Sequence, residues 1–269
     1  MTSTYVLYHY NPSFAAALCF TVAFGVSTAA HLWQACRYKT RFMIPFIIGA
    51  IIETLGYAAR IVSAKQSPDW SVGPYAIQSL LLLLAPPLLA ASIYMVLGRI
   101  IRLVEGEERS LLHPKKLTKV FTSGDVLSFL TQCAGGGMLS QAKTESKVLL
   151  GERVIIVGLF VQVLFFGGFM ILSVLFHRNI HRNPTTASLA TDNRGGVPAW
   201  KTCLYVLYTV SLLIMVRSIY RVVEYIQGSE GYLQGHEAYL YVLDAALMLV
   251  VCGVFIWKHP GALIRVSKK

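Results

Sequence analysis

The sequence predicts an all-α fold, a seven-transmembrane-helix bundle with its N-terminus outside and its C-terminus in the cytoplasm. Three observations lead to this prediction. Only 14% of the 269 residues are charged and 55% are hydrophobic, whereas soluble domains carry roughly 25% charged residues. Seven stretches are mostly apolar over the roughly 20 residues that a helix needs to cross a bilayer. Lys and Arg are concentrated in alternate connections between these stretches.

The apolar stretches are predicted to be helices because backbone groups in hydrocarbon must find hydrogen bonds within their own segment. In chain order they cover residues 13–35, 42–61, 75–97, 120–140, 154–176, 204–223 and 238–257. The first is interpreted as an uncleaved span and not as a signal peptide, since no basic residue precedes it. We therefore predict one membrane domain over residues 1–269 that ends in a short basic cytoplasmic tail, 258–269.

The distribution of Lys and Arg gives the orientation of the bundle. The connections 36–41, 98–119 and 177–203, together with the tail, hold 17 of these residues, whereas the connections on the opposite side hold 4. By the positive-inside rule, the side richer in Lys and Arg is cytoplasmic. The net charge of +11 therefore reflects membrane topology. No nucleic-acid partner is predicted, because the basic residues lie in loops and form no continuous face.

Neither a cofactor nor a metal is predicted. The five cysteines are Cys19, Cys36, Cys133, Cys203 and Cys252. Their number is odd, they lie in or beside apolar runs and no C-x-x-C occurs, which argues against a disulfide framework and a metal site. No Walker A pattern is present, so ATP is not expected to power the protein directly.

The predicted spans from the second to the seventh carry polar residues that are costly in a bilayer. A charge at the centre of a span costs about 2.5–3.5 kcal/mol. The polar residues are Glu53, Tyr57, Arg60, Gln78, Asp125, Gln132, Gln162, Arg217, Arg221, Glu224, Glu237 and Asp244. Within a span, spacings of three, four or seven place them on one helical face. We expect these faces to line a polar cleft for a substrate, or alternatively to form ion pairs that lock the helices together.

The predicted orientation also gives each polar residue a depth, at a rise of about 1.5 Å per residue. The outer half contains Arg60, Gln78, Arg217, Arg221, Glu224, Glu237 and Asp244. Glu53 and Gln132 fall near the middle of the bilayer, and Asp125 lies in the inner third. The cleft is therefore expected to open toward the outer leaflet and to narrow inward. Its slight excess of acids would suit an amphiphile that carries an amine, or a proton relay.

Two groups of helix-breaking residues stand within the spans. Pro86 and Pro87 interrupt the third span near its middle, and Gly135, Gly136 and Gly137 loosen the outer end of the fourth. Proline frees backbone carbonyls and kinks a helix, and small residues let backbones approach closely. We interpret these residues as a hinge with an unwound ligand contact. Kinks and tight packing alone are the alternative.

Several short motifs follow one another through the second to the seventh spans. They are Glu53-x-x-Gly56-Tyr57-x-x-Arg60, Leu84-Ala85-Pro86, Ala90-Ala91-Ser92-Ile93-Tyr94-Met95, Gly98-Arg99, Asp125-x-x-Ser128-Phe129-x-x-Gln132, Gly158 with Gln162, Arg217-x-x-Tyr220-Arg221-x-x-Glu224-Tyr225, Glu237 with Tyr241 and Asp244, and His259-Pro260-Gly261. This ordered set resembles the fungal lipid-translocating exporter family, seven-span proteins related to the aminocholesterol-resistance and sphingoid long-chain-base release proteins. Pro87, where the family pattern has a small residue, and the short tail depart from it.

The resemblance implies a multi-pass fungal membrane protein that exports or flips lipid-like or toxic amphiphilic molecules and so gives resistance to them. Members are linked to long-chain bases, sterol-like amines and porphyrins, and such proteins can accompany a metabolite cluster. The implied partners are membrane lipids and an amphiphilic small-molecule substrate. The implied location is the plasma membrane, with the endoplasmic reticulum or another endomembrane as the alternative.

Two other functions share parts of the pattern. A heptahelical sensor or receptor has the same topology, but no lysine for a retinal Schiff base occurs between Ala238 and Trp257. An integral-membrane enzyme such as a terpene cyclase could use Glu53, Asp125 or Asp244 as a buried acid. These acids lie at different predicted depths, and no aspartate-rich metal motif is present. We therefore predict a transporter or translocator and not an enzyme, with no catalytic residues.

Overall fold

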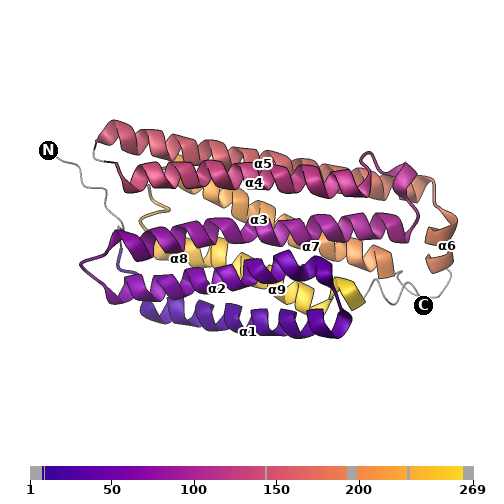
Figure 1. Ribbon diagram of the computed structural model, residues 1–269, viewed down its shortest axis with the longest axis horizontal. Helices are drawn as coiled ribbons and strands as arrows, with labels where there is room; N and C mark the ends of the chain where they lie inside the picture. Colours follow the sequence, from indigo (N-terminus) through magenta and orange to yellow (C-terminus); the bar gives the residue numbers. More distant parts are fainter. Residues whose placement is uncertain (1–7, 9, 143, 193–198, 229–230, 263–269) are drawn as a thin grey trace.

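The computed structural model describes residues 8, 10–142, 144–192, 199–228 and 231–262, and these residues contain no β-strand. Their long helices run side by side in one up-and-down bundle (Figure 1). They are α1 (Phe14–Tyr38), α2 (Ile44–Lys65), α3 (Val72–Leu103), α4 (Pro114–Ser140), α5 (Glu145–Arg182) and α7 (Ala199–Ile226). The last long element joins α8 (Glu237–Leu240), a π-helical segment (Tyr241–Ala245) and α9 (Ala246–Trp257). The predicted all-α bundle is confirmed.

Six helical stretches among the described residues are long and apolar enough to cross a membrane. They are α1, α2, α3, α5, α7 and the element that joins α8 to α9. Although α4 is 27 residues long, it is not among the six, because polar residues and glycines interrupt its apolar sequence. It packs against α5 on one side and α3 on the other (Figure 1). The fourth predicted span, 120–140, and with it the total of seven spans, therefore stay a prediction.

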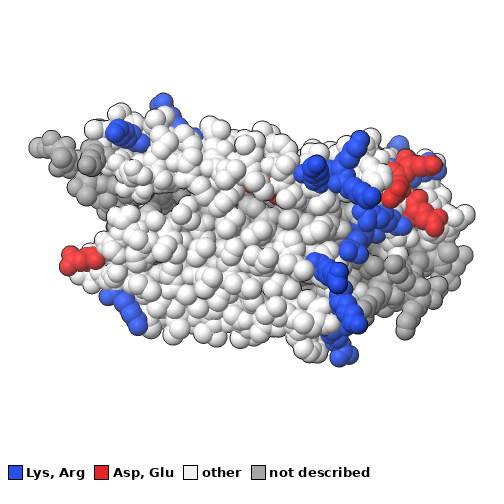
Figure 2. All heavy atoms as spheres, in the orientation of Figure 1, with Lys and Arg blue, Asp and Glu red and all other residues white. Residues whose placement is uncertain are grey.

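The outward faces of the bundle are covered by apolar side chains. Val26 on α1 is 66% exposed and Leu164 on α5 is 71% exposed. In water such a surface would be an aggregation hazard, whereas hydrocarbon solvates it. Figure 2 shows the same surface as a broad band almost without charge, with Lys and Arg gathered near the end of the bundle that carries the α1–α2 and α3–α4 connections. This distribution is the one that the predicted orientation requires, and the orientation itself stays a prediction.

The helices extend beyond the predicted spans. At both ends α3 and α5 are longer than residues 75–97 and 154–176, because their polar terminal turns continue the helix past the apolar run. The two long connections contain a 3₁₀ turn (Glu107–Arg109) and the short helix α6 (Thr186–Asp192). Residues 263–269 of the predicted tail lie outside the described residues.

The two prolines do not interrupt the third span, contrary to the sequence-based prediction. Helix α3 continues through Pro86 and Pro87. Pro86 has no N–H to donate to the carbonyl of Leu82, four residues earlier, and Arg217 on α7 donates to that carbonyl instead, with an Nη2–O distance of 2.8 Å. The side chain of a neighbouring helix thus satisfies the freed backbone group. The hinge role of the prolines stays a prediction.

The glycines of α4 mark its closest approach to α5. A Cβ added at Gly135 would lie 2.7 Å from the carbonyl oxygen of Gly151 on α5, so this position has no room for a side chain. A Cβ added at Gly137 would meet nothing within 4 Å. Helix α4 stays regular through all three glycines to Ser140. Gly135 therefore serves helix packing, and the hinge role predicted for Gly135, Gly136 and Gly137 remains a prediction.

Candidate functional site

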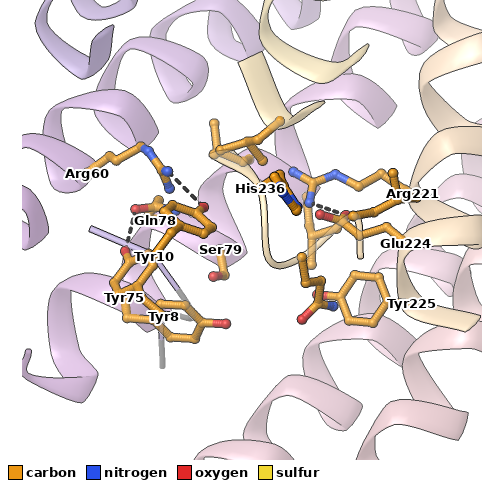
Figure 3. A pocket seen from close by; sticks show the side chains of 15 residues that line it. Tyr8, Tyr10, Arg60, Tyr75, Gln78, Ser79, Arg221, Glu224, Tyr225 and His236 are labelled. Atoms are coloured by element: carbon orange, nitrogen blue, oxygen red, sulfur yellow. Dashed lines mark hydrogen bonds and ion pairs between the residues drawn. The ribbon is translucent and has the colours of Figure 1, made fainter. Parts of the chain in front are cut away.

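A polar cavity of about 80 Å³ lies inside the bundle near the end that carries the N-terminal segment. Its walls come from that segment, from α2, α3 and α7, and from the described residues of the α7–α8 connection. The labelled side chains in Figure 3 are Tyr8, Tyr10, Arg60, Tyr75, Gln78, Ser79, Arg221, Glu224, Tyr225 and His236. Arg60 and Gln78 stand on one side, facing Arg221 and Glu224 on the other (Figure 3). Separate helices thus bring their polar faces to one place, which we call the polar cavity.

Arg60 on α2 organises one side of the polar cavity. Its guanidinium donates to the Tyr241 hydroxyl at 3.0 Å, to the Tyr10 hydroxyl at 2.9 Å and to the Glu237 carboxylate at 2.8 Å. Glu237 also accepts from the backbone N–H of Ser13, at 2.9 and 3.0 Å to its two oxygens. One carboxylate therefore joins α2, α8 and the start of α1. A negative group beside a helix N-terminus is also stabilised by the helix dipole.

Two tyrosines that precede α1 complete this side, and the sequence-based prediction missed both. The Tyr8 hydroxyl donates to Gln78 Oε1 at 2.9 Å. The Tyr8 ring packs edge-on against Tyr75, with 5.1 Å between ring centroids. Burial raises the pKa of Tyr8 and Tyr10, so both hydroxyls stay neutral hydrogen-bonding groups at physiological pH. An aromatic residue close to the mouth of a span was the only signal available in the sequence.

The opposite side of the polar cavity is built around Asp244, which lies in the π-helical segment. Its carboxylate pairs with both Arg217 and Arg221 of α7. Arg221 also pairs with Glu224 at 2.9 Å, one turn along the same helix. All four side chains are buried. A single π-helical turn shifts the side-chain register of a helix and is frequent at functional sites. Here that turn contains the acid that joins two arginines.

Glu53 and Tyr57 lie deeper, on the face of α2 that also carries Arg60. Glu53 is 2% exposed and its Oε1 has no hydrogen-bond partner in the described structure, and the buried Tyr57 hydroxyl has none either. The charged cluster then comprises four carboxyl groups (Glu53, Glu224, Glu237 and Asp244) and three guanidinium groups (Arg60, Arg217 and Arg221). If all seven groups are ionised, one negative charge is left over. An extra cation or a bound proton would restore balance.

The structure separates three predicted site residues from this cluster. The Asp125 carboxylate accepts a hydrogen bond from the Tyr94 hydroxyl of α3 at 2.8 Å, with phenylalanine rings around Tyr94. Gln132 donates to Ser128 at 2.7 Å and to Gln162 of α5 at 3.1 Å. These contacts join α4 to α3 and to α5, away from the residues that line the polar cavity. Of the remaining nine predicted polar residues, eight lie in the cavity wall or in the charged cluster, and Tyr57 lies on the face of α2 that carries Glu53 and Arg60.

Fold and site together define an integral α-helical membrane protein that keeps a charged, polar cavity within its bundle. Comparison with known proteins identifies the family to which the chain belongs. A family profile described as "RTA1 like protein" matches residues 46–267, and the chain belongs to this family. The resemblance inferred from the motifs is thereby confirmed.

Several relatives carry names that refer to protoporphyrin, lipids or a long-chain base. "Protoporphyrin uptake protein 1" of Saccharomyces cerevisiae is 36% identical, over 94% of this chain and 91% of that protein. "Probable lipid transporter atnI" of Emericella nidulans is 29% identical, over 98% and 72%. "Sphingoid long-chain base transporter RSB1" of Saccharomyces cerevisiae is 28% identical, over 89% and 69%. No solved structure matches the chain.

Proposed function

We propose that the protein transports lipid-like amphiphilic molecules and exports them or flips them between leaflets, with the head group of the substrate held in the polar cavity. The observation that carries this proposal is the polar cavity itself: charged side chains from α2 and α7 line it inside a bundle whose outer surface is apolar. Ionisable groups within a membrane are costly and commonly mark a substrate path. The relatives named as transporters favour transport over catalysis by the buried acids.

The chemistry of the polar cavity favours a cationic head group, such as an amine. Arg60 and Arg221 are already paired with carboxylates, so neither presents an unneutralised charge to an anion. The cluster has one carboxyl group more than it has guanidinium groups. Tyr8, Tyr10 and Tyr75 add aromatic rings to the wall, and such rings attract cations through their faces. We place this activity at the plasma membrane, where export would give resistance.

Replacing Ser79 by Phe should strongly reduce transport. Ser79 lies on the α3 wall of the polar cavity, and a phenyl ring at this position would occupy the space of the head group. Efflux of long-chain bases and sterol amines from a sensitive yeast strain, measured with its tolerance to them, should rise with the wild-type protein. With Ser79→Phe it should fall by at least about tenfold, the effect of a binding loss near 1.4 kcal/mol.

The control is Ser123→Phe, the same change on an exposed position of α4. It should leave efflux at the wild-type level at equal protein abundance. If the wild-type protein changes neither tolerance nor efflux for any compound in the panel, the transport proposal is wrong. Equal efflux by Ser79→Phe and Ser123→Phe would instead show that transport does not use the polar cavity.

A further inference from the structure

A second hollow lies directly beside the polar cavity, between α3 and α4. Its volume is about 170 Å³, similar to an apolar protein cavity of about 150 Å³ that accommodates benzene. Leu80 of α3 and Gly136 and Gly137 of α4 form its sides, and Ile155 of α5 closes it from behind. Most of these groups are apolar or lack a side chain. We call this hollow the apolar groove.

The apolar groove and the polar cavity share a wall. Tyr75, Ser79, Leu83 and Tyr225 line both hollows. The carbonyl of Leu83 cannot receive the usual helical hydrogen bond, because the residue four positions later is Pro87 and has no N–H. On the cavity side, Nε of the buried Arg221 has no hydrogen-bond partner in the described structure. The shared wall therefore includes a backbone carbonyl that lacks its usual helical hydrogen bond, and the buried Arg221 lies on the cavity side of that wall.

The apolar groove also reaches the outer surface of the bundle. Leu80 on its rim is 37% exposed, and Gly137 on the opposite rim is exposed as well. A Cβ added at Gly137 would meet nothing within 4 Å, and one added at Gly136 would meet only Leu80, at 4.0 Å. The two glycines thus leave a gap that any larger residue would fill. In the membrane this rim faces acyl chains, so the groove joins the polar cavity to the lipid.

We propose that the apolar groove holds the first part of the hydrocarbon chain of a single-chain amphiphile whose amine head group occupies the polar cavity. The rest of the chain extends between α3 and α4 into the bilayer, and the substrate enters sideways from the lipid. This inference rests on the proposed function and deepens it, because it assigns a place to the hydrocarbon chain of the substrate and a route of entry. A chain in the groove and a head group in the cavity match the two halves of such a molecule.

The test measures how binding depends on chain length. Saturated primary amines of increasing length are titrated into the protein in lipid nanodiscs, and binding to empty nanodiscs is subtracted. With the wild-type protein, affinity relative to the amine free in water should rise about fourfold for each methylene that leaves water for the apolar groove. Gly137→Leu fills the groove, so it should weaken binding of the long amines by at least about tenfold and leave the shortest amines unaffected.

Gly253→Leu is the matched control, since Gly253 is exposed on α9 and an added Cβ there also meets nothing within 4 Å. It should bind every amine as the wild-type protein does, and both variants should keep the wild-type melting temperature. If amine affinity depends on chain length equally in Gly137→Leu and Gly253→Leu, the apolar groove does not bind the hydrocarbon chain. The transport proposal would be unaffected by that result. Absence of amine binding at every length, together with absence of efflux, would overturn the proposed function itself.

Discussion

Asp244→Asn should destabilise the protein more than any other substitution considered, by about 3–5 kcal/mol, the range found when one partner of a buried ion pair is removed. The asparagine fits the same space but cannot neutralise Arg217 and Arg221, which are both buried and both paired with Asp244. Two buried guanidinium charges would remain with one carboxylate, Glu224, paired to Arg221. The thermal unfolding midpoint of the purified protein in detergent would report this loss.

Asp69→Asn provides the control, because it makes the same chemical change at an exposed position. Its unfolding midpoint should match that of the wild-type protein. A second arm combines Asp244→Asn with Arg217→Met, which removes one charge of each sign. Part of the lost stability should return, because the double variant no longer contains the Arg217 guanidinium that Asp244→Asn leaves without a carboxylate partner. If Asp244→Asn melts at the wild-type temperature, the ion pairs do not stabilise the bundle.

The second large effect is expected at the contact between α4 and α5. Gly135→Ala should destabilise the protein by about 1–3 kcal/mol, the usual cost of overpacking a close contact. The new methyl group would lie 2.7 Å from the Gly151 carbonyl oxygen and 2.9 Å from the Ile155 backbone nitrogen. Both neighbours are backbone atoms, so the helices themselves must separate. The same unfolding assay measures the change.

Gly137→Ala, two residues along the same helix, is the matched comparison. Its methyl group would meet nothing within 4 Å, and alanine is a better helix former than glycine by about 1 kcal/mol. This variant should therefore be as stable as the wild-type protein or slightly more stable. Equal melting temperatures for the Gly135 and Gly137 variants would contradict the close packing described for α4 and α5.

The sequence was sufficient to predict the helical bundle, because hydrophobic length alone determines where a chain can cross a bilayer. It also placed Arg217, Arg221 and Asp244 in the same half of the bilayer and left ion pairs between helices as one alternative, because buried charges need partners. It could not assign Asp125 to Tyr94 and away from the charged cluster. That choice depends on which helices are neighbours and how each is rotated, and no local pattern encodes either property.

Other features depended on contacts between distant parts of the chain. Pro86 predicts a break when α3 is considered alone, and only the guanidinium of Arg217 on another helix explains why the helix continues. Tyr8 and Tyr10 precede the first span, so their place in the cavity wall follows from the fold of the whole bundle. The apolar groove arises where Gly136 and Gly137 face α3, whereas Gly135 faces α5.

Arg217 on α7 connects an ion pair to the backbone of α3. It pairs with Asp244 of the π-helical segment and also donates to a carbonyl of α3. The same guanidinium binds Asp244 and the Leu82 carbonyl, so drawing it toward a new anion, or losing the charge on Asp244, would also leave a peptide oxygen of α3 without a donor. A change of charge at Asp244 would therefore disturb a backbone hydrogen-bond acceptor of a different helix, α3.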